Sequence, residues 1–323
     1  MINRDIYNKA PQDNRLVNNG VAEVSEDHSE AAQSILRYEL ETFVCDGQYE
    51  KGIETILDKF LMNLSSKTEQ PGVWVSGFYG SGKSHLAKML RTLWTDYTFA
   101  DGAAARSIAK LPDGVIEHLK ELTTQGKRLG GLHAAAGKLG AGAGDKVRLA
   151  LLSIIFKSKG LPEQYNQAQF LLWLQKEELV DKLQAELKTV GKTLEQELPH
   201  MYVSGHLAKA LLKVQPDLGS SEADVKQILK AQFPQVTDIT SEQLVAAIEA
   251  TLSNNGKFPL TLVVLDEVQQ YIGTDAEKAF QIQEVTETLS KKFNGQLLFV
   301  GTGQSALSGM PNLQRLMAAF QCK

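Results

Sequence analysis

Hydrophobic residues recur at helical spacing in two early stretches of the chain, residues 32–44 and 53–64. Asp46-Gly47 lies between them and predicts a turn. Residues 1–28 are polar and mixed, which favours an extended arm. After the turn signal Pro71-Gly72, the β-branched and aromatic residues 73–75 predict a short buried strand.

The middle of the chain, from about residue 100 to 255, has mostly helical periodicity. Residues 171–190 predict one amphipathic helix that packs against the rest of the protein. The glycine-rich stretch 130–144 interrupts this region and contains weak G-x-G patterns. We expect a flexible loop there rather than a second phosphate site, although residues 129–136 could form a strand.

Uninterrupted apolar runs return in the last quarter of the chain. LTLVVL (260–265) and QLLFV (296–300) are typical of parallel strands that are buried on both faces. Apolar residues from Ile282 to Phe293 predict a helix between them, and Asn294-Gly295 predicts the following turn. These patterns together predict an α/β fold, with a parallel sheet flanked by helices and a large helical insertion at about 100–255. We expect an N-terminal unit over residues 1–68 and the main domain over 69–323.

Composition supports a soluble protein with a sizeable core, since 43% of the 323 residues are hydrophobic and 22% are charged. The longest apolar runs are too short to span a bilayer, and the N-terminus lacks the apolar core of a signal peptide, so we expect a cytoplasmic protein without membrane contact. Cys45 and Cys322 provide neither a disulfide framework nor metal-ligand spacing. The formal net charge of −4 shows no global basic character, although residues 106–159 contain ten Lys or Arg against four acidic residues.

The strongest chemical signal is GFYGSGKS at residues 77–84, which fits the pattern G-x-x-x-x-G-K-[ST]. The strand at 73–75 precedes it, and apolar residues from Leu86 to Trp94 predict a helix after it. Such a loop directs backbone N–H groups and the positive end of a helix toward phosphate. We therefore expect ATP to bind there, with Lys83 reaching the β- and γ-phosphates and Ser84 contributing a hydroxyl to Mg²⁺. The other predicted nucleotide-binding residues are Gly77, Gly80, Ser81, Gly82 and His85.

Two carboxylates, Asp266 and Glu267, follow the apolar run at 260–265. An acidic pair at this position alone more often marks a helix N-terminus, but the upstream phosphate loop favours a catalytic role. We expect Asp266 to hold Mg²⁺ through water and Glu267 to polarise the attacking water. The strand ending at residues 300–304 should lie beside these strands, with Gln304, or secondly Thr302, sensing the γ-phosphate.

These three motifs together resemble an AAA+ ATPase. The stretches RYELETFVCDGQYEKGIETILDKFL and VWVSGFYGSGKSHLAKMLRTLW resemble the N-terminal ATPase region of the BrxC/PglY-type proteins of BREX phage-defence systems. The similarity is dense over residues 35–94 and renewed over 260–305. The resemblance implies an ATPase that works with a DNA methyltransferase and other BREX components, as a homo-oligomer with ATP at the subunit boundary.

The sequence departs from this family at its C-terminal end. We expect no later strand to close the sheet and no helical lid, which suggests a fragment. The resemblance places an arginine finger before Phe320, where this chain has Ala319. Arg315 is the nearest candidate, although a surface charge is the favoured interpretation.

Two functions of different classes remain open. One is an ATPase that drives assembly of a DNA-defence complex, which Glu267 favours; the other is an interaction platform that binds ATP as a switch with little turnover. A small-molecule kinase is disfavoured because nothing resembles a phosphoacceptor site. The basic segment 106–159 could contact DNA through Lys127-Arg128 and the adjoining glycine stretch, but a solvated charged face is favoured.

Overall fold

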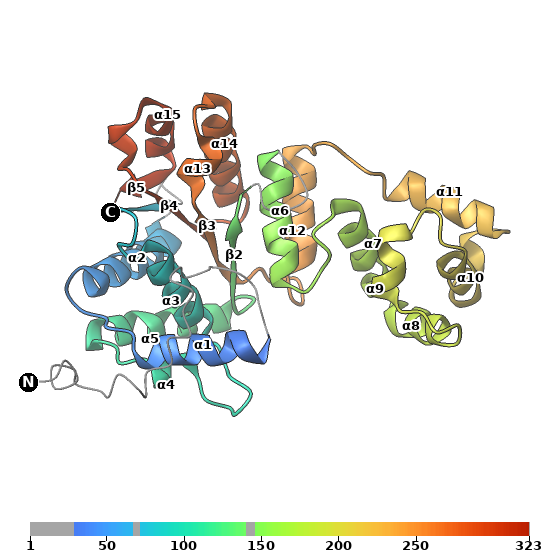
Figure 1. Ribbon diagram of the computed structural model, residues 1–323, viewed down its shortest axis with the longest axis horizontal. Coiled ribbons are helices and arrows are strands. Elements are labelled where there is room, and N and C mark those ends of the chain that lie inside the picture. The colour runs from blue at the N-terminus through green and yellow to red at the C-terminus, as the bar shows by residue number, and fades with distance from the viewer. Residues whose placement is uncertain (1–28, 67–71, 140–145, 323) are drawn as a thin grey trace, which may run out of the picture.

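The computed structural model describes residues 29–66, 72–139 and 146–322. The arm predicted at residues 1–28, the Pro71 turn signal and the glycines at 140–144 lie outside these residues. Five parallel strands form one sheet in the order β2-β3-β4-β1-β5. The strands are β1 (Gly72–Ser76), β2 (Leu132–Lys138), β3 (Leu260–Asp266), β4 (Leu297–Gly303) and β5 (Phe320–Cys322). The predicted α/β fold with a parallel sheet flanked by helices is confirmed at this level (Figure 1).

One layer of helices covers the first face of the sheet. It contains α1 (Glu30–Glu41), α2 (Gly47–Ser66), α3 (Lys83–Thr95), α4 (Ala105–Ile108) and α5 (Asp113–Arg128). These helices share a hydrophobic cluster with alternate residues of the strands, including Leu262, Val264 and Val300. The predicted N-terminal helices therefore pack into the same core as the sheet. Helix α1 ends at Glu41, so Val44, which the sequence pattern placed on its apolar face, lies outside it with 65% of its surface exposed.

The second face of the sheet packs against α6 (Val147–Ser158), α12 (Ser241–Leu252), α13 (Val268–Ile272), α14 (Ala276–Lys292) and α15 (Pro311–Gln314). Val263, Leu265 and Phe299 point into this cluster, while their neighbours in the strands point into the first one. Burial on both faces explains the uninterrupted apolar runs in β3 and β4.

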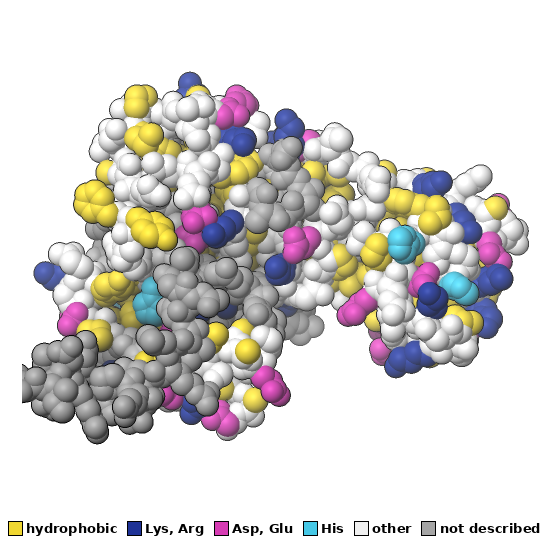
Figure 2. Space-filling model, in the orientation of Figure 1, with side chains coloured by type: hydrophobic (Ala, Val, Ile, Leu, Met, Phe, Trp, Pro, Cys, Tyr) yellow, Lys and Arg dark blue, Asp and Glu magenta, His cyan; other side chains and the backbone are white. Residues whose placement is uncertain are grey.

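A separate helical lobe projects from the sheet layers (Figure 1). It contains α7 (Tyr165–Lys176), α8 (Val180–Lys188), α9 (Leu194–Glu197), α10 (Gly205–Val214) and α11 (Glu222–Gln232), which enclose their own hydrophobic cluster. Helices α6 and α12 connect this lobe to β2 and β3. The face of the molecule shown in Figure 2 carries Lys and Arg beside Asp and Glu over this lobe. Among the described residues, no helix has both the length and the apolar character needed to cross a bilayer.

Two expectations about local structure are wrong. Residues 171–190 form two helices instead of one, because Glu178 adopts a left-handed backbone (φ 56°) between α7 and α8. The break lets Leu174, Leu179 and Leu183 all enter the core of the lobe. A later strand does join the sheet, since β5 pairs in parallel with β1 through Gly72–Trp74.

The possible strand at residues 129–136 exists as β2, shifted to Leu132–Lys138. It forms one edge of the sheet and pairs with β3 over its full length, so that Lys138 lies opposite Asp266. Residues 132–138 of the glycine-rich stretch are therefore part of the sheet and not a loop, while residues 140–144 lie outside the described part of the chain. This register brings a basic residue to the acidic pair.

Candidate nucleotide site

The candidate site lies at the carboxyl ends of β1, β3 and β4, where open parallel sheets bind ligands. Strand β4 pairs with both β1 and β3, which confirms that the strand ending at residues 300–304 lies beside the other two. A pocket of about 250 Å³ opens there. The predicted residues among its lining are Gly80, Gly82, Lys83, Ser84, His85, Asp266, Glu267, Thr302 and Gln304.

The glycine-rich loop connects β1 to α3. Gly80 and Gly82 have φ values of 78° and 81°, in the left-handed region that favours glycine. Gly82 is also the N-cap of the 13-residue helix α3, so the positive end of the helix dipole faces the pocket. This local geometry suits an anion at the loop.

Lys83 curls back over the loop that precedes it. Its Nζ donates hydrogen bonds to the carbonyl oxygens of Gly77 at 2.6 Å and Phe78 at 2.8 Å, and lies 3.5 Å from Ser81 Oγ. The ammonium group therefore lies within the curve of the loop, beside the N-terminus of α3.

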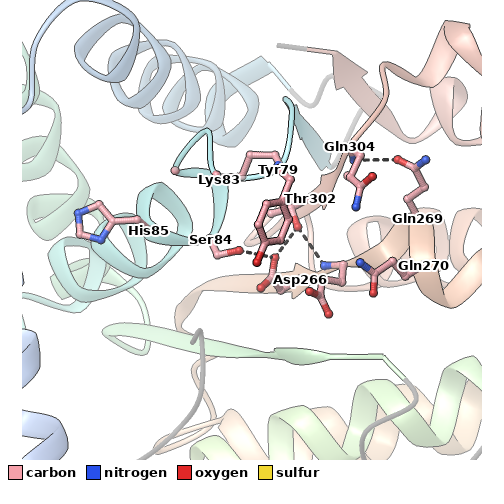
Figure 3. A pocket seen from close by; sticks show the side chains of 13 residues that line it. Tyr79, Lys83, Ser84, His85, Asp266, Gln269, Gln270, Thr302 and Gln304 are labelled. Carbon is pink, nitrogen blue, oxygen red and sulfur yellow. Dashed lines mark hydrogen bonds between the residues drawn. The ribbon is translucent and has the colours of Figure 1, made fainter. Parts of the chain in front are cut away.

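Ser84 and Asp266 meet although 182 positions separate them in the sequence. Ser84 Oγ donates a hydrogen bond to Asp266 Oδ1 at 3.2 Å (Figure 3). The Asp266 residue is 2% exposed, so its carboxylate is held almost entirely by protein. A hydroxyl and a carboxylate oxygen are suitable donors for Mg²⁺, which usually takes only one or two carboxylates and completes its shell with phosphate and water. Among the described residues no group of three or more His, Cys, Asp or Glu is placed to hold a metal ion.

Thr302 connects the two acidic residues. Its hydroxyl donates to Asp266 Oδ1 and accepts a hydrogen bond from the Glu267 backbone N–H at 3.0 Å. The residue is 1% exposed, and both of these bonds hold the acidic pair. The Thr302 side chain therefore positions Asp266 and Glu267, and its second-choice role as a γ-phosphate sensor stays a prediction.

Glu267 lies at the rim of the pocket in a left-handed backbone conformation (φ 55°), as the N-cap of α13. Its Oε2 pairs with Lys138 Nζ at 2.8 Å. Both side chains are partly exposed, so this ion pair contributes little to stability. Lys138 was missed from sequence because its strand was placed only approximately.

Gln304 follows β4, and its side chain projects toward the pocket (Figure 3). Its backbone N–H donates to Gln269 Oε1 at 2.8 Å. Gln269 belongs to α13 and was not identified from sequence, because no local pattern links it to a residue 35 positions away.

The remaining predicted residues lie around the pocket. The His85 side chain points away from Ser84 and Asp266 (Figure 3), and its ring packs edge-on against Phe43 at 5.7 Å. Burial lowers the pKa of His85. The Glu39 carboxylate partly opposes this shift and the Lys88 ammonium adds to it, so the ring is neutral at physiological pH. Gly77 and Ser81 line a second pocket on the other side of the loop.

This second pocket has a volume of about 490 Å³ and lies between α2 and the loop. Its apolar walls come from Tyr49, Ile56, Val75 and Leu86. The Tyr49 hydroxyl donates to the Ser81 carbonyl oxygen at 3.2 Å and so ties α2 to the loop. Gly82 and Lys83 line both pockets, so the two meet at the start of α3.

The predicted basic segment does not form a single free surface. The Arg106 guanidinium is enclosed and donates to the carbonyl oxygens of Leu93, Trp94 and Leu119. Arg148 pairs with Asp238 and Lys157 with Glu163, acids from outside the segment. Lys127-Arg128 ends α5, shortly before the start of β2. The two residues therefore lie near the amino ends of the strands, whereas the site lies at the carboxyl ends.

The arginine-finger position contains a buried alanine, since Ala319 is 0% exposed and precedes β5. Arg315 lies in a short 3₁₀ turn with its guanidinium 5.9 Å from the centre of the Phe280 ring.

No protein-family model and no solved structure matches this chain.

Proposed function

We propose that this chain binds ATP with Mg²⁺ and hydrolyses it, as an AAA+-type P-loop ATPase. The observation that carries the proposal is the contact between Ser84, at the end of the glycine loop, and Asp266, at the end of a separate buried strand. A glycine-rich turn that fitted the motif by chance would have no reason to face a buried carboxylate.

Each loop residue has a role that follows from its position. Lys83 would move from the Gly77 and Phe78 carbonyl oxygens to the β- and γ-phosphates, which are stronger acceptors because they are charged. Ser84 and Asp266 would hold Mg²⁺, which neutralises charge on the phosphates. The N–H groups at the start of α3 would bind phosphate oxygens.

Glu267 is the proposed residue that polarises the attacking water. Its carboxylate lines the pocket, and Thr302 fixes its backbone. Gln304 would contact the γ-phosphate or the water from the neighbouring strand. Glu267 is also paired with Lys138. To polarise the water, its carboxylate must either break this ion pair or accept a hydrogen bond from the water while it remains paired.

The second pocket would receive the base of the nucleotide. It meets the phosphate pocket at Gly82 and Lys83, and its walls are largely apolar. A flat heterocycle suits such walls, whereas a triphosphate suits the polar side. One molecule could thus occupy both pockets.

The proposed biological setting is BREX phage defence, on the resemblance of residues 35–94 and 260–305. There the chain would act with a DNA methyltransferase and other BREX components, in a homo-oligomer and in the cytoplasm, and direct DNA contact stays a prediction. The alternative is a nucleotide switch with little turnover. Glu267 at the pocket rim favours hydrolysis, because a pure binder does not need a carboxylate there.

Two substitutions test the proposal. Lys83→Ala should abolish ATP binding measured by calorimetry, while Lys120→Ala, which removes an exposed lysine on α5, should leave it unchanged. Glu267→Gln should retain ATP binding but lower steady-state hydrolysis by about 10²-fold. Wild-type affinity in Lys83→Ala would refute the site, whereas binding without turnover in the wild type would favour the switch.

A further inference from the structure

The segment that follows β4 is held by one amide side chain. Gln269 Oε1 accepts hydrogen bonds from the backbone N–H groups of Gln304 at 2.8 Å and Ser305 at 2.9 Å. Its Nε2 donates to Ser305 Oγ at 3.3 Å and lies 3.1 Å from Met310 Sδ. Both ends of the Gln269 amide are therefore engaged with the segment that follows the strand.

A second contact fixes the same segment from the other side. The Trp74 indole N–H, from β1, donates to the Ser305 carbonyl oxygen at 2.9 Å. The N–H, the carbonyl and the hydroxyl of Ser305 are thus all bonded, to side chains of two different elements. The backbone at residues 304–305 is fixed, while the Gln304 side chain remains exposed at the pocket.

Gln269 also belongs to the element that carries the acidic pair. Helix α13 begins directly after Glu267, so only Val268 separates the carboxylate from the Gln269 amide. A displacement of α13 would therefore move Glu267 and the segment of Gln304 together. Both side chains need a defined place relative to the γ-phosphate, and an error of about 1 Å in such an arrangement can cost about 10²-fold in rate.

We propose that Gln269 is a positioning residue, which holds Gln304 in register with Glu267 during ATP hydrolysis. This inference rests on the proposed ATPase function. Gln269 itself need not contact the nucleotide, because both of its amide atoms are used on residues 304, 305 and 310. Its effect on turnover should pass through Gln304.

A double-mutant cycle tests this dependence. Gln304→Ala should lower kcat by about 10²-fold, as for loss of a positioned donor. Gln269→Leu should lower kcat by up to about the same factor without changing ATP affinity. The double variant should turn over no more slowly than Gln304→Ala alone, because residues that act as a unit are not additive. Independent, additive losses would overturn the proposal, and so would wild-type kcat in Gln269→Leu.

Two further measurements separate positioning from a merely structural role. Gln269→Glu keeps the oxygen that accepts both N–H groups, so kcat should recover relative to Gln269→Leu; a kcat as low as that of Gln269→Leu counts against the proposal. Amide hydrogen exchange at Gln304 and Ser305 should accelerate in Gln269→Leu. It should stay at the wild-type rate in Gln270→Leu, a change at the neighbouring pocket residue.

The proposed function and this inference fail in different ways. The ATPase function would be refuted if the wild-type chain showed no ATP turnover, or only turnover that Lys83→Ala does not abolish. The exchange measurement then decides alone: unchanged exchange at Gln304 and Ser305 in Gln269→Leu would overturn the positioning role.

Discussion

The Thr302 hydroxyl connects the two carboxylate residues of the candidate site. It donates to the Asp266 carboxylate and accepts from the Glu267 backbone N–H, which holds Glu267 in a left-handed conformation. That conformation is uncommon for a residue with a Cβ and persists only where its surroundings enforce it. The strain therefore lies at the residue for which we propose the catalytic role.

His133, on β2, provides a prediction about stability at this scale. Its Nε2 lies 2.9 Å from Ser158 Oγ, and burial, together with the nearby charge of Lys159, lowers its pKa to about 4. Because the folded-state pKa lies below the ordinary 6.5, the unfolded chain binds the proton more readily. The contribution of His133 to the free energy of unfolding is complete above pH 6.5 and is lost as the pH falls toward 4. This loss amounts to at most about 3 kcal/mol.

Chemical denaturation at pH 7 and pH 4.5 measures this effect in the wild type and in His133→Gln. The free energy of unfolding should fall more steeply in the wild type, because the variant lacks the titrating ring. Carboxylates that titrate in this range are common to both proteins and cancel in the comparison. Equal pH dependence in the two proteins would show that His133 is not the group responsible.

The individual site residues differ in how far sequence could identify them. Lys83, Ser84, Asp266, Glu267 and Gln304 were found because each belongs to a local pattern of strand, loop and helix, and the structure gathers all five around one pocket. Lys138, Gln269 and Trp74 were not found. Their contacts join residues more than 30 positions apart, and nothing in their sequence neighbourhoods marks them.

At the scale of elements, α2 and the glycine loop form the walls of the second pocket. Gly52 lies within the 20-residue helix α2 and lines that pocket, and a Cβ added there meets nothing within 4 Å. We therefore expect the leucine side chain of Gly52→Leu to enter the pocket from open space at its Cβ. It should also raise the free energy of unfolding by about 0.5–1 kcal/mol, since glycine is unfavourable inside a helix.

We expect Gly52→Leu to bind ATP at least about tenfold more weakly, a loss of about 1.4 kcal/mol. Its affinity for inorganic tripolyphosphate should not change, because that ligand lacks a base. Gly52→Ala is the matched control, with the same helix effect and a much smaller side chain. Calorimetry with both ligands decides: equal weakening of ATP and tripolyphosphate would place the base elsewhere.

Helices and strands were predictable where burial produces one simple pattern of apolar residues along the sequence. Strands β3 and β4 appear as apolar runs because both of their faces are covered. Strand β2 was uncertain since it lies at the sheet edge and consists largely of alanine and glycine, which carry weak strand signals. The break at Glu178 could not be foreseen, because the apolar spacing continues through it and only the packing of the lobe decides the turn.

At the scale of the whole molecule, the helical lobe has its own core, separate from the two clusters that sandwich the sheet. ATP bound at the carboxyl ends of the strands should stabilise the sheet layers and leave the lobe nearly unaffected. At 100 times the dissociation constant, the stabilisation amounts to about 2.7 kcal/mol. Hydrogen exchange should therefore slow in helices such as α3 and α14, and stay unchanged in α8, α10 and α11. Equal slowing in the lobe would mean that the lobe and the sheet unfold as one unit.

The strand order also has a consequence for how the protein folds. Both neighbours of β1 come from residues 297–322, more than 200 positions later in the sequence. Strand β2 pairs with β3, and the entire lobe lies between these two strands in the sequence. Every pairing of β1 thus requires closure of a very long loop, whereas the lobe is built from contacts between residues close in sequence. Local contacts form faster than distant ones, so the lobe should fold early and the sheet late. During synthesis, the glycine loop would leave the ribosome long before the strands that hold it in place.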